Sequence, residues 1–586
     1  MKIDPEKRKE LEAEGILVDM TDEELEYFRQ QQGKEEKKEN QADALIRMAA
    51  TEAFLFHDDT KNGYAALPIN GHRETWPLRS KFFKQWLVRR YYEQTEKSPN
   101  NEAIRQALNV IEAKAVFDGP EMKLSLRVAE HDGAFWYDLA NEAWQVVKIT
   151  PDGWEVVDNP PILFRRFKNT AAQVLPERGG SLDLLKEYIN LKDDKDWLLL
   201  TALIIHAFVP GVPHTIPVFY GDKGAAKTTA QRVIRRLIDP AHRDTMTLPT
   251  DKNELALILM TNYAPCFDNL DGLSPWQSDM LCQAATGGGI SKRELYTDCE
   301  EVILSFLRCP MLNGINLVAS RDDLLDRSVL FKLERIDEDE RKTENEFWRE
   351  FEQDRPYILG AVFSALAGAL EVYPTVKLPA LPRMADFATW GYAIMEAIEP
   401  GGGEKFLQAY RKNIAGAVEE AVINDVVGAA IVEFMAGKDE WQGTASELLE
   451  TLNELPSVNE KDKAWPKRAN TLTRRLNRIK SALADYGIKL EEYREPGFDR
   501  TRLLKISKNI VLTVPTVLKT PEAPENKGFS KDDIEDDIED DRTITEKISS
   551  FPEALKNMAW DDKDDKDDIS LTSQKSDKPG WEVWEI

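Results

Sequence analysis

A lysine and a threonine at the start of a helical segment are the residues of this chain best suited to bind phosphate. Lys227 and Thr228 follow a loop of small residues, 221–226, which itself follows a short apolar run, 216–220. A strand–loop–helix of this kind cradles phosphate with backbone N–H groups, while the lysine reaches the β- and γ-phosphates and the threonine ligates Mg²⁺. The predicted nucleotide-binding residues are Gly221, Asp222, Lys223, Gly224, Ala225, Ala226, Lys227, Thr228 and Thr229.

One position departs from the usual pattern of such a phosphate-binding loop, or P-loop. The glycine that normally precedes the lysine is Ala226 here. A methyl group is compatible with a residue at a helix start, so we expect the loop to remain functional. The alternative is a small-residue turn that precedes a helix by chance.

A carboxylate about forty residues downstream is placed to complete the magnesium site. Asp268 ends an apolar strand in YAPCFDNLDGL, and a carboxylate at the edge of a strand beside the P-loop holds Mg²⁺ through water. We therefore predict Thr228 and Asp268 as the metal-binding residues. The usual neighbouring glutamate is replaced by Asn269, and Asp271 is the nearest other carboxylate. The identity of the catalytic base is left open, and a simple turn role for Asp268 is the alternative.

Further polar residues follow in an order that suits nucleotide hydrolysis. Asn313 ends a second apolar strand, where it is placed to touch the γ-phosphate or the attacking water. Arg327 stands directly before another strand, where a guanidinium suits transition-state charge on a neighbouring subunit's nucleotide. Between them and the P-loop, a glycine cluster is followed by Lys292 and Arg293. Any single arginine is more often a surface salt-bridge residue.

These residues must be positioned by a chain of 586 residues, which is enough for roughly three or four domains. Residues 191–340 alternate helices and strands, as an α/β core does, and residues 341–425 read as mostly helical. The predicted domains are a charged arm (1–44), a mixed α/β domain (45–190), an ATPase core with a helical lid (191–425), a C-terminal domain (426–512) and an acidic low-complexity tail (513–586).

The 45–190 domain has regular elements without a chemical signature. Strand-like runs are Ala65–Ile69, Lys123–Val128, Phe135–Asp138, Gln145–Ile149 and Trp154–Val157, with helices near 78–92 and 102–115. The paired carboxylates of a primase–polymerase are not found in a strand context. The sequence therefore does not say what this domain does.

A basic helix marks the C-terminal domain. Residues 463–480 carry seven basic residues and no acidic one, and Asn470 or Thr471 is the expected helix cap. A helix over 445–452 precedes it and a strand–turn–strand follows it, with Gly497 in the turn, as in a winged helix. The predicted DNA contacts of this domain are Lys467, Arg468, Arg474, Arg475 and Arg478. An ordinary solvated basic face is the alternative.

The overall charge of −27 does not exclude DNA, because electrostatic footprints are local. Much of the negative charge lies in the tail, which ends in GWEVWEI. The tail either solubilises the protein, docks Trp581 and Trp584 on a replication partner, or competes with DNA for basic grooves. The four cysteines lack zinc or disulfide spacing, and the longest apolar run, 197–210, is too short for a bilayer and reads as a buried helix. We expect a cytoplasmic protein with no membrane partner.

The order of P-loop, FDN, hairpin, NGI and LLDR resembles the AAA+ ATPases of the superfamily 3 and minichromosome-maintenance-like helicases of phages, plasmids and chromosomal islands. The phrases FDNLDGLS, ATGGGISKRELYTDCEEVI and LLDRSVL carry the resemblance over roughly 160–400. It implies an α/β fold with an AAA+ core, a C-terminal winged helix and a disordered tail. The implied roles are Walker A for Lys227 and Thr228, Walker B for Asp268, sensor 1 for Asn313, arginine finger for Arg327, sensor 2 for Arg383, and a channel hairpin for Lys292 and Arg293.

The resemblance implies an ATP-dependent DNA helicase or translocase of a mobile genetic element, with ATP and Mg²⁺ as cofactors. Its partners would be single-stranded or forked DNA and other copies of the chain in a ring, expected to be a hexamer. The alternative is an origin-binding initiator or assembly ATPase with little unwinding, which Asn269 in place of glutamate slightly favours. The expected catalytic residues are Lys227, Asp268, Asn269, Asn313, Arg327 and Arg383.

Overall fold

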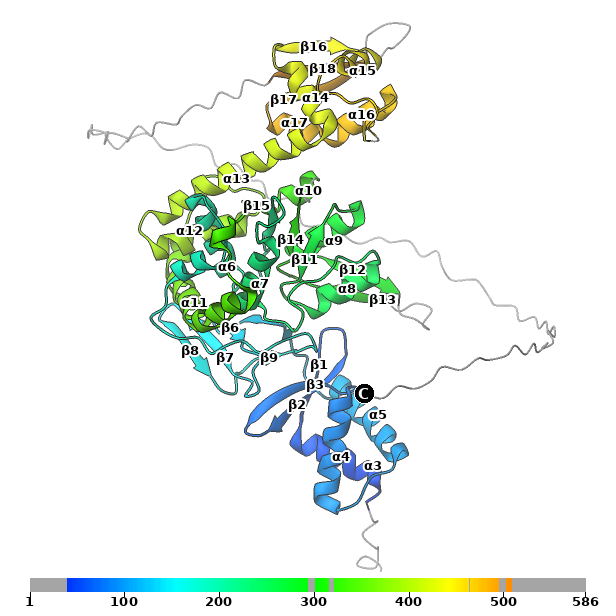
Figure 1. The fold of residues 1–586 in the computed structure, drawn as a ribbon. Helices are drawn as coiled ribbons and strands as arrows, with labels where there is room; N and C mark the ends of the chain where they lie inside the picture. The colour runs from blue at the N-terminus through cyan, green and yellow to red at the C-terminus, as the bar shows by residue number, and fades with distance from the viewer. Residues whose placement is uncertain (1–38, 294–300, 316–320, 463, 495–501, 509–586) are drawn as a thin grey trace, which may run out of the picture. The chain divides into compact units, whose positions relative to one another are not determined.

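Four parallel strands form the sheet on which the predicted site depends (Figure 1). The computed structural model describes residues 39–293, 301–315, 321–462, 464–494 and 502–508. The strand order is β11-β14-β10-β15, with bounds Cys266–Leu270, Met311–Gly314, Ile216–Tyr220 and Ser328–Lys332 respectively. Met246 adds an isolated parallel bridge to Phe267 of β11. The strands alternate with helices along the chain, which confirms the predicted mixed α/β class.

Helices cover both faces of this sheet. Successive side chains of a strand point to opposite faces, and all five residues of β10 are buried. Val218 packs in one hydrophobic cluster with residues of α8 (Lys252–Thr261) and α9 (Pro275–Thr286). Phe219 packs in another with α6 (Asp194–His206) and α7 (Lys227–Ile238). The expected buried helix in the 197–210 run is thus confirmed as α6.

Three long helices follow β15, as the sequence predicts for 341–425. They are α11 (Glu344–Val372), α12 (Ala385–Ile398) and α13 (Gly402–Asn424). The side chain of Asn413 on α13 hydrogen-bonds both backbone groups of Leu330, so it covers the free edge of β15. By length and composition α11 is apolar enough to cross a membrane. Ile358, Phe363 and Leu366 of α11 are fully buried in the largest hydrophobic cluster, which makes it a core helix.

A separate antiparallel sheet packs into the same core from the N-terminal side of the sequence. Its strands are β5 (Val128–His131), β6 (Ala134–Asp138), β7 (Val146–Thr150) and β8 (Gly153–Val157), in that order. Tyr137 and Ile149 belong to the hydrophobic cluster that contains α6, α7 and α11. The hydrophobic clusters therefore divide the predicted 45–190 domain, because its second half shares a core with the central sheet.

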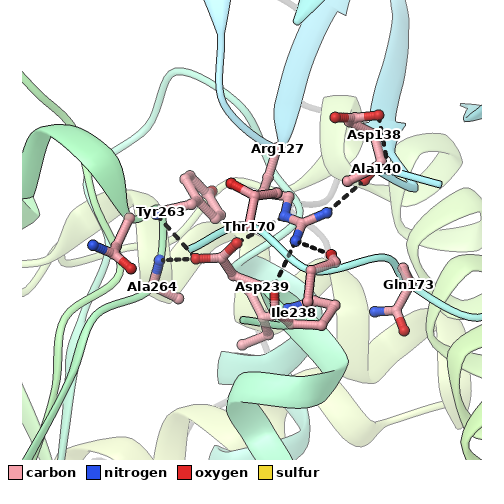
Figure 2. A network of polar contacts seen from close by, with 12 residues as sticks. Arg127, Asp138, Ala140, Thr170, Gln173, Ile238, Asp239, Tyr263 and Ala264 are labelled. Atoms are coloured by element: carbon pink, nitrogen blue, oxygen red, sulfur yellow. Dashed lines mark hydrogen bonds and ion pairs between the residues drawn. The ribbon is translucent and has the colours of Figure 1, made fainter. Parts of the chain in front are cut away.

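A buried polar network ties this sheet to the end of α7 (Figure 2). Arg127 is 1% exposed, and its guanidinium donates to the Asp239 carboxylate at 2.7 Å and to the carbonyls of Asp138, Ala171 and Pro240. The other Asp239 oxygen accepts the backbone N–H groups of Tyr263 and Ala264, each at 3.0 Å. Burial would raise the pKa of Asp239, but Arg235 and Arg127 outweigh it and hold that pKa below its usual value.

The same network explains one error in the strand prediction. A single strand over Lys123–Val128 is wrong, because only β4 (Leu124–Ser125) pairs with β9 (Leu163–Phe164) and Val128 begins β5. Arg127 lies between these strands with its side chain buried in the network. The chain therefore leaves one sheet and enters the other at this residue. The remaining strands and helices predicted for 45–190 are confirmed with shifted ends.

The first part of the described chain forms its own small core. It consists of α3 (Gln41–Glu52), β1 (Phe54–His57), β2 (Gly63–Ile69), β3 (His72–Pro77), α4 (Lys81–Thr95) and α5 (Asn101–Phe117). Asn40, Ser80 and Asn100 cap the three helices through side-chain oxygens. The buried residues of α3, α4 and α5 form one hydrophobic cluster with residues of β2.

The C-terminal part has a core of its own between α14 and β18. Its elements are α14 (Val426–Met435), β16 (Glu440–Gly443), α15 (Ala445–Asn453), α16 (Ala469–Arg478), α17 (Lys480–Asp485), β17 (Ile488–Arg494) and β18 (Arg502–Lys508), with sheet order β16-β18-β17. The expected cap at Asn470 or Thr471 is wrong. Leu472 N already bonds Arg468 O, so α16 begins at Ala469 with Arg468 as its N-cap.

Several predictions fall outside the described residues. They concern most of the 1–44 arm, the tip of the hairpin after Arg293, Lys463, Gly497, and the whole 513–586 tail with Trp581 and Trp584.

Replacing Arg127 with methionine is expected to destabilise the core by about 3–5 kcal/mol, because Asp239 would lose a buried charge partner. The denaturation midpoint of the full chain measures the effect. Lys405→Met removes an ion pair to Glu399 whose side chains are both more than half exposed, and it serves as the control with little expected change. An Arg127→Met protein as stable as the control variant would contradict the structural role of the network.

Candidate nucleotide-binding site

Three residues with left-handed backbone turn the chain between β10 and α7. Gly221 has φ 134°, Gly224 has φ 84°, and Ala226 has φ 59°. Ala226 is the N-cap of α7 and makes no side-chain hydrogen bond to the helix. A left-handed alanine costs roughly 1 kcal/mol relative to glycine, so the missing glycine is accommodated with strain. The N–H groups at the start of α7 have no side-chain cap, which is the geometry of an anion site.

Lys227 lies across the loop. Its Nζ donates to the carbonyl of Gly221 at 2.7 Å and to that of Asp222 at 2.8 Å. Partial burial lowers the pKa of Lys227, while the carboxylates of Asp222 and Asp268 act in the opposite direction. The ammonium is thus held over the loop by two neutral carbonyls, which a more strongly charged ligand can replace.

Thr228 and Asp268 meet although forty positions separate them. The Thr228 hydroxyl donates to Asp268 Oδ1 at 3.0 Å, from the first turn of α7 to β11. Hydroxyl and carboxylate oxygens are ligands that Mg²⁺ accepts, and Mg²⁺ usually binds through one or two carboxylates together with substrate phosphates and waters. Among the described residues no group of three or more His, Cys, Asp or Glu side chains gathers around a point. The pair therefore fits Mg²⁺ better than a metal held by protein ligands alone.

Asn313 is buried at the end of β14 and held in a fixed orientation. Its Oδ1 accepts the backbone N–H of Asn269 at 2.9 Å, and its Nδ2 donates to Gln231 Oε1 at 2.6 Å. Gln231 is itself fully buried and donates to the carbonyl of Phe267. Sequence reasoning missed Gln231, whose only signal is a polar residue on the apolar face of α7. The amide of Asn313 is thereby locked beside the residue that follows Asp268.

The backbone conformation at position 269 favours asparagine over glutamate. Its backbone φ is 55°, at an irregularity in the pairing of β11 with β14, and its side chain is exposed. Asparagine tolerates the left-handed conformation better than glutamate does. Asp271, the nearest other carboxylate, is also exposed.

Arg327 and Arg383 are both associated with Asp323. Arg327 is 8% exposed, and its Nη1 donates to the carboxylate and the carbonyl of Asp323. Partial burial would raise the pKa of Asp323, but Arg327, with a smaller contribution from Arg383, lowers it. Arg383 is exposed just before α12. Within the described part of the chain, neither arginine is bonded to the 221–228 segment, and their catalytic roles stay predictions.

Two arginines that the sequence analysis did not single out lie close to the loop. The segment after β15 runs alongside it, with Ile336 N donating to Gly224 O at 3.3 Å. A Cβ atom added to Gly224 would lie 3.8 Å from Arg341 Nη2 and 3.9 Å from Arg335 Cγ. Their signal in the sequence is a pair of arginines within the acidic stretch LERIDEDER.

The predicted DNA contacts fall into two groups. Lys292 and Arg293 end β12 (Gly289–Arg293), which pairs antiparallel with β13 (Glu301–Ser305), so the expected hairpin is confirmed at the level of the backbone. In the C-terminal part, Lys467, Arg468, Arg474 and Arg478 are exposed on or just before α16.

Arg475 differs from its neighbours on α16. Its guanidinium donates to Asp425 Oδ2 at 2.9 Å and to the carbonyl of Ala464 at 2.6 Å. The other oxygen of Asp425 caps α14 by accepting the N–H groups of Val427 and Gly428. The helical periodicity turns Arg475 toward α14. Its charge is therefore paired with Asp425 within the protein.

Residues 182–419 match the actinomycete integrative conjugative element replication protein family, AICE RepA, and residues 427–520 match the RepA C-terminal domain. No curated protein matches. The matches support the coarse prediction of a mobile-element replication protein, and the family boundary near 420–427 coincides with the end of α13.

Two of the solved structures that match this chain have low identity and low TM-scores. The apo NrS-1 C-terminal region is 12% identical with a TM-score of 0.36, covering 79% of this chain and 99% of that one. SCCmec type IV Cch, described as an active helicase, is 12% identical with a TM-score of 0.42, covering 78% of this chain and 93% of that one.

Replacing Gly221 with alanine is expected to distort the loop. The added Cβ would lie 2.2 Å from Leu333 O, and the residue has φ 134°. We expect the affinity for a Mg²⁺–nucleotide to fall at least tenfold, measured by calorimetry, with roughly 1–3 kcal/mol of lost stability from backbone strain alone. Gly272→Ala, where a Cβ meets nothing within 4 Å, is the matched control. Equal nucleotide affinity of both variants would argue against this loop as the site.

Proposed function

We propose that this chain, which is similar over most of residues 182–520 to replication proteins of integrative conjugative elements, is an ATPase that drives a DNA-remodelling step of replication. The observation that carries the proposal is the convergence of Lys227, Thr228 and Asp268 at the carboxyl edge of a parallel sheet. Ligands of open α/β sheets bind at this edge. The strand order, with the bridge at Met246 beyond β11, is also that expected of an AAA+ core.

In this proposal the phosphates of ATP lie at the uncapped start of α7. Lys227 exchanges its carbonyl partners, Gly221 and Asp222, for β- and γ-phosphate oxygens. Mg²⁺ supplies charge neutralisation of the phosphates, and Thr228 and Asp268 would hold it. Arg335 and Arg341, beside Gly224, add positive charge on the open side of the loop.

Positioning of water, rather than proton abstraction, is the chemistry that the neighbouring amides suit. An asparagine side chain does not act as a base near neutral pH, so Asn269 cannot replace a glutamate in that role. Asn313 has a fixed amide next to Asp268 and can orient a water for in-line attack, as amide side chains do in other phosphoryl-transfer enzymes. Asp271, the next carboxylate along the chain after Asp268, would accept the proton.

Assembly into a ring, with a hexamer as the expected form, would bring an arginine of one copy to the nucleotide of the next. Arg327 is bonded to Asp323, Arg383 only helps to lower the pKa of that carboxyl, and neither is bonded to the 221–228 segment among the described residues. An arginine presented to the nucleotide of an adjacent copy stabilises the transition state. Arg327 would leave Asp323 in the assembled state, a rearrangement that exposes a residue now 8% exposed.

DNA binding is assigned to two places. The order helix, strand, three further helices and two strands from α14 to β18, in which α17 directly follows α16, supports a winged helix with α16 as the helix that lies along DNA. The β12–β13 hairpin, carrying Lys292 and Arg293, would contact a strand within the ring channel. Together these features favour an ATP-dependent helicase or translocase acting on single-stranded or forked DNA.

A second function is an ATP-switched initiator or assembly ATPase that orders subunits at an origin with little unwinding. Asn269 in place of a catalytic carboxylate favours it, since slow hydrolysis suits a switch better than a motor. Strand displacement on forked DNA separates the two. A replication partner that binds the 513–586 tail is compatible with either function.

Lys227→Ala and Arg327→Ala are each expected to lower ATP hydrolysis by ~10³-fold or more. Lys227→Ala should also lose nucleotide binding, whereas Arg327→Ala should keep it. Mixing the two proteins should restore part of the steady-state hydrolysis, because some junctions then pair an intact loop with an intact arginine. Arg321→Ala, which loses an exposed ion pair to Asp279, is the control for folding and activity. Hydrolysis independent of protein concentration, without complementation, would leave Arg327 as a structural residue.

Arg474→Ala with Arg478→Ala is expected to weaken duplex binding. If both arginines contact phosphates, the slope of log affinity against log salt should become about 1.8 units shallower. Arg475→Ala is the comparison from the same helix, and it should lower thermal stability because Asp425 loses its partner. Anisotropy titrations with labelled duplex measure the first effect and thermal melting the second. Unchanged duplex affinity of the double variant would remove α16 as a DNA contact.

A further inference from the structure

A groove on the exposed side of α4 lies outside both family matches and outside the nucleotide site. Its volume is about 510 Å³, and Lys81, Lys84, Gln85, Arg89, Tyr92 and Ser98 line it around Val88. We call it the α4 groove. The opposite face of α4 carries Phe83, Trp86, Leu87 and Tyr91, which are buried in the N-terminal core. The groove therefore occupies the face that the core does not use.

The charge of the α4 groove is opposite to that of the chain. Three of its lining residues are cations and none is a carboxylate, although the protein carries a net charge of −27. Arg89 pairs with Glu93, but its side chain is 77% exposed, so the pair is weak and easily exchanged. Lys81 and Lys84 make no ion pair with any described residue. A ligand with several negative charges is the complement of this surface.

Tyr92 adds an aromatic surface to these cations. Its side chain is exposed on the same helical face as Lys81, Lys84 and Val88, and the residue is 59% exposed. From residue 81 to residue 92 the helix rises about 16 Å. Cations that follow a backbone, together with an aromatic ring on which a base stacks, are the elements of single-strand recognition.

The wall of the groove is held rigidly from behind. Arg90 donates to Glu52 of α3 at 2.6 Å, and Gln94 donates to the same carboxylate at 3.0 Å. Ser80 caps α4 by accepting the N–H of Phe83, and no binding role is assigned to the helix N-terminus. A ligand in the α4 groove would therefore be bound by the side chains that line it.

We propose that the α4 groove binds one strand of nucleic acid, with Lys81, Lys84 and Arg89 on its phosphates and Tyr92 stacked on a base. A duplex fits less well, because its bases are already stacked and offer Tyr92 no free face. An acidic peptide matches the charge but gives the ring no planar partner. The site does not use the 221–226 loop, so its occupancy does not depend on nucleotide.

The test measures binding of the full chain to a labelled oligothymidylate and to a matched duplex, without nucleotide. Lys81→Ala with Lys84→Ala should lower single-strand affinity about tenfold and make its salt slope about 1.4 units shallower, with duplex affinity unchanged. Tyr92→Ala should lower single-strand affinity at least fivefold, while Tyr92→Phe keeps it, because the ring remains. Lys61→Ala with Lys114→Ala removes the same charge elsewhere on the surface of the N-terminal part, where both side chains are exposed, and should have no effect.

The opposite results overturn the proposal. These are unchanged single-strand affinity, equal losses for strand and duplex, or losses reproduced by the Lys61 and Lys114 control. Competition by polyglutamate that is insensitive to Tyr92→Ala would instead identify an acidic peptide site. Repeating the titration with Lys227→Ala distinguishes this site from the proposed ATPase, since groove binding should persist in a protein that cannot bind nucleotide.

Discussion

The buried carboxylate of Asp239 is the constraint on which the candidate site depends. It stands at the end of α7, and its two oxygens bond different partners: Arg127, just before β5 of the antiparallel sheet, and the backbone N–H groups of Tyr263 and Ala264. Tyr263 and Ala264 directly precede β11. One side chain thereby sets the position of α7 relative to β11 and to the β5–β8 sheet. Because Thr228 starts that helix and Asp268 lies on that strand, their 3.0 Å contact follows from this anchor.

The hydrogen bonds that hold α7 and β11 together also allow strained backbone to persist near the 221–226 loop. Left-handed backbone at Ala226 and Asn269 is unfavourable for residues with a Cβ, and it persists only where surrounding structure determines it. Gln231 contributes by connecting Asn313 to the backbone of Phe267 within the protein interior. A hydrogen-bonded frame of this kind holds polar groups in place before a ligand arrives, which lowers the reorganisation that phosphoryl transfer would require.

Local charge, rather than net charge, decides where an acidic chain of this kind can meet a polyanion. Arg474 and Arg478 face solvent, while Arg475, between them in sequence, is turned inward to Asp425. The α4 groove has cations without carboxylates, and its neighbouring Arg90 is engaged with Glu52. In both places the helical period separates cations that stabilise the fold from cations that are exposed to a partner.

The sequence by itself determined the elements whose signal is local. The apolar run before Gly221 predicted β10, the spacing of Val233, Ile234 and Leu237 predicted α7, and the P-loop pattern placed Lys227 and Thr228 at the helix start. Only the tertiary structure decided which polar residues meet, because contacts such as Arg127–Asp239 and Gln231–Asn313 join positions more than eighty residues apart and leave no periodic trace. It also decided that the second half of the 45–190 segment shares the central core and that Arg475 is a structural residue, since burial depends on the partner that a face finds.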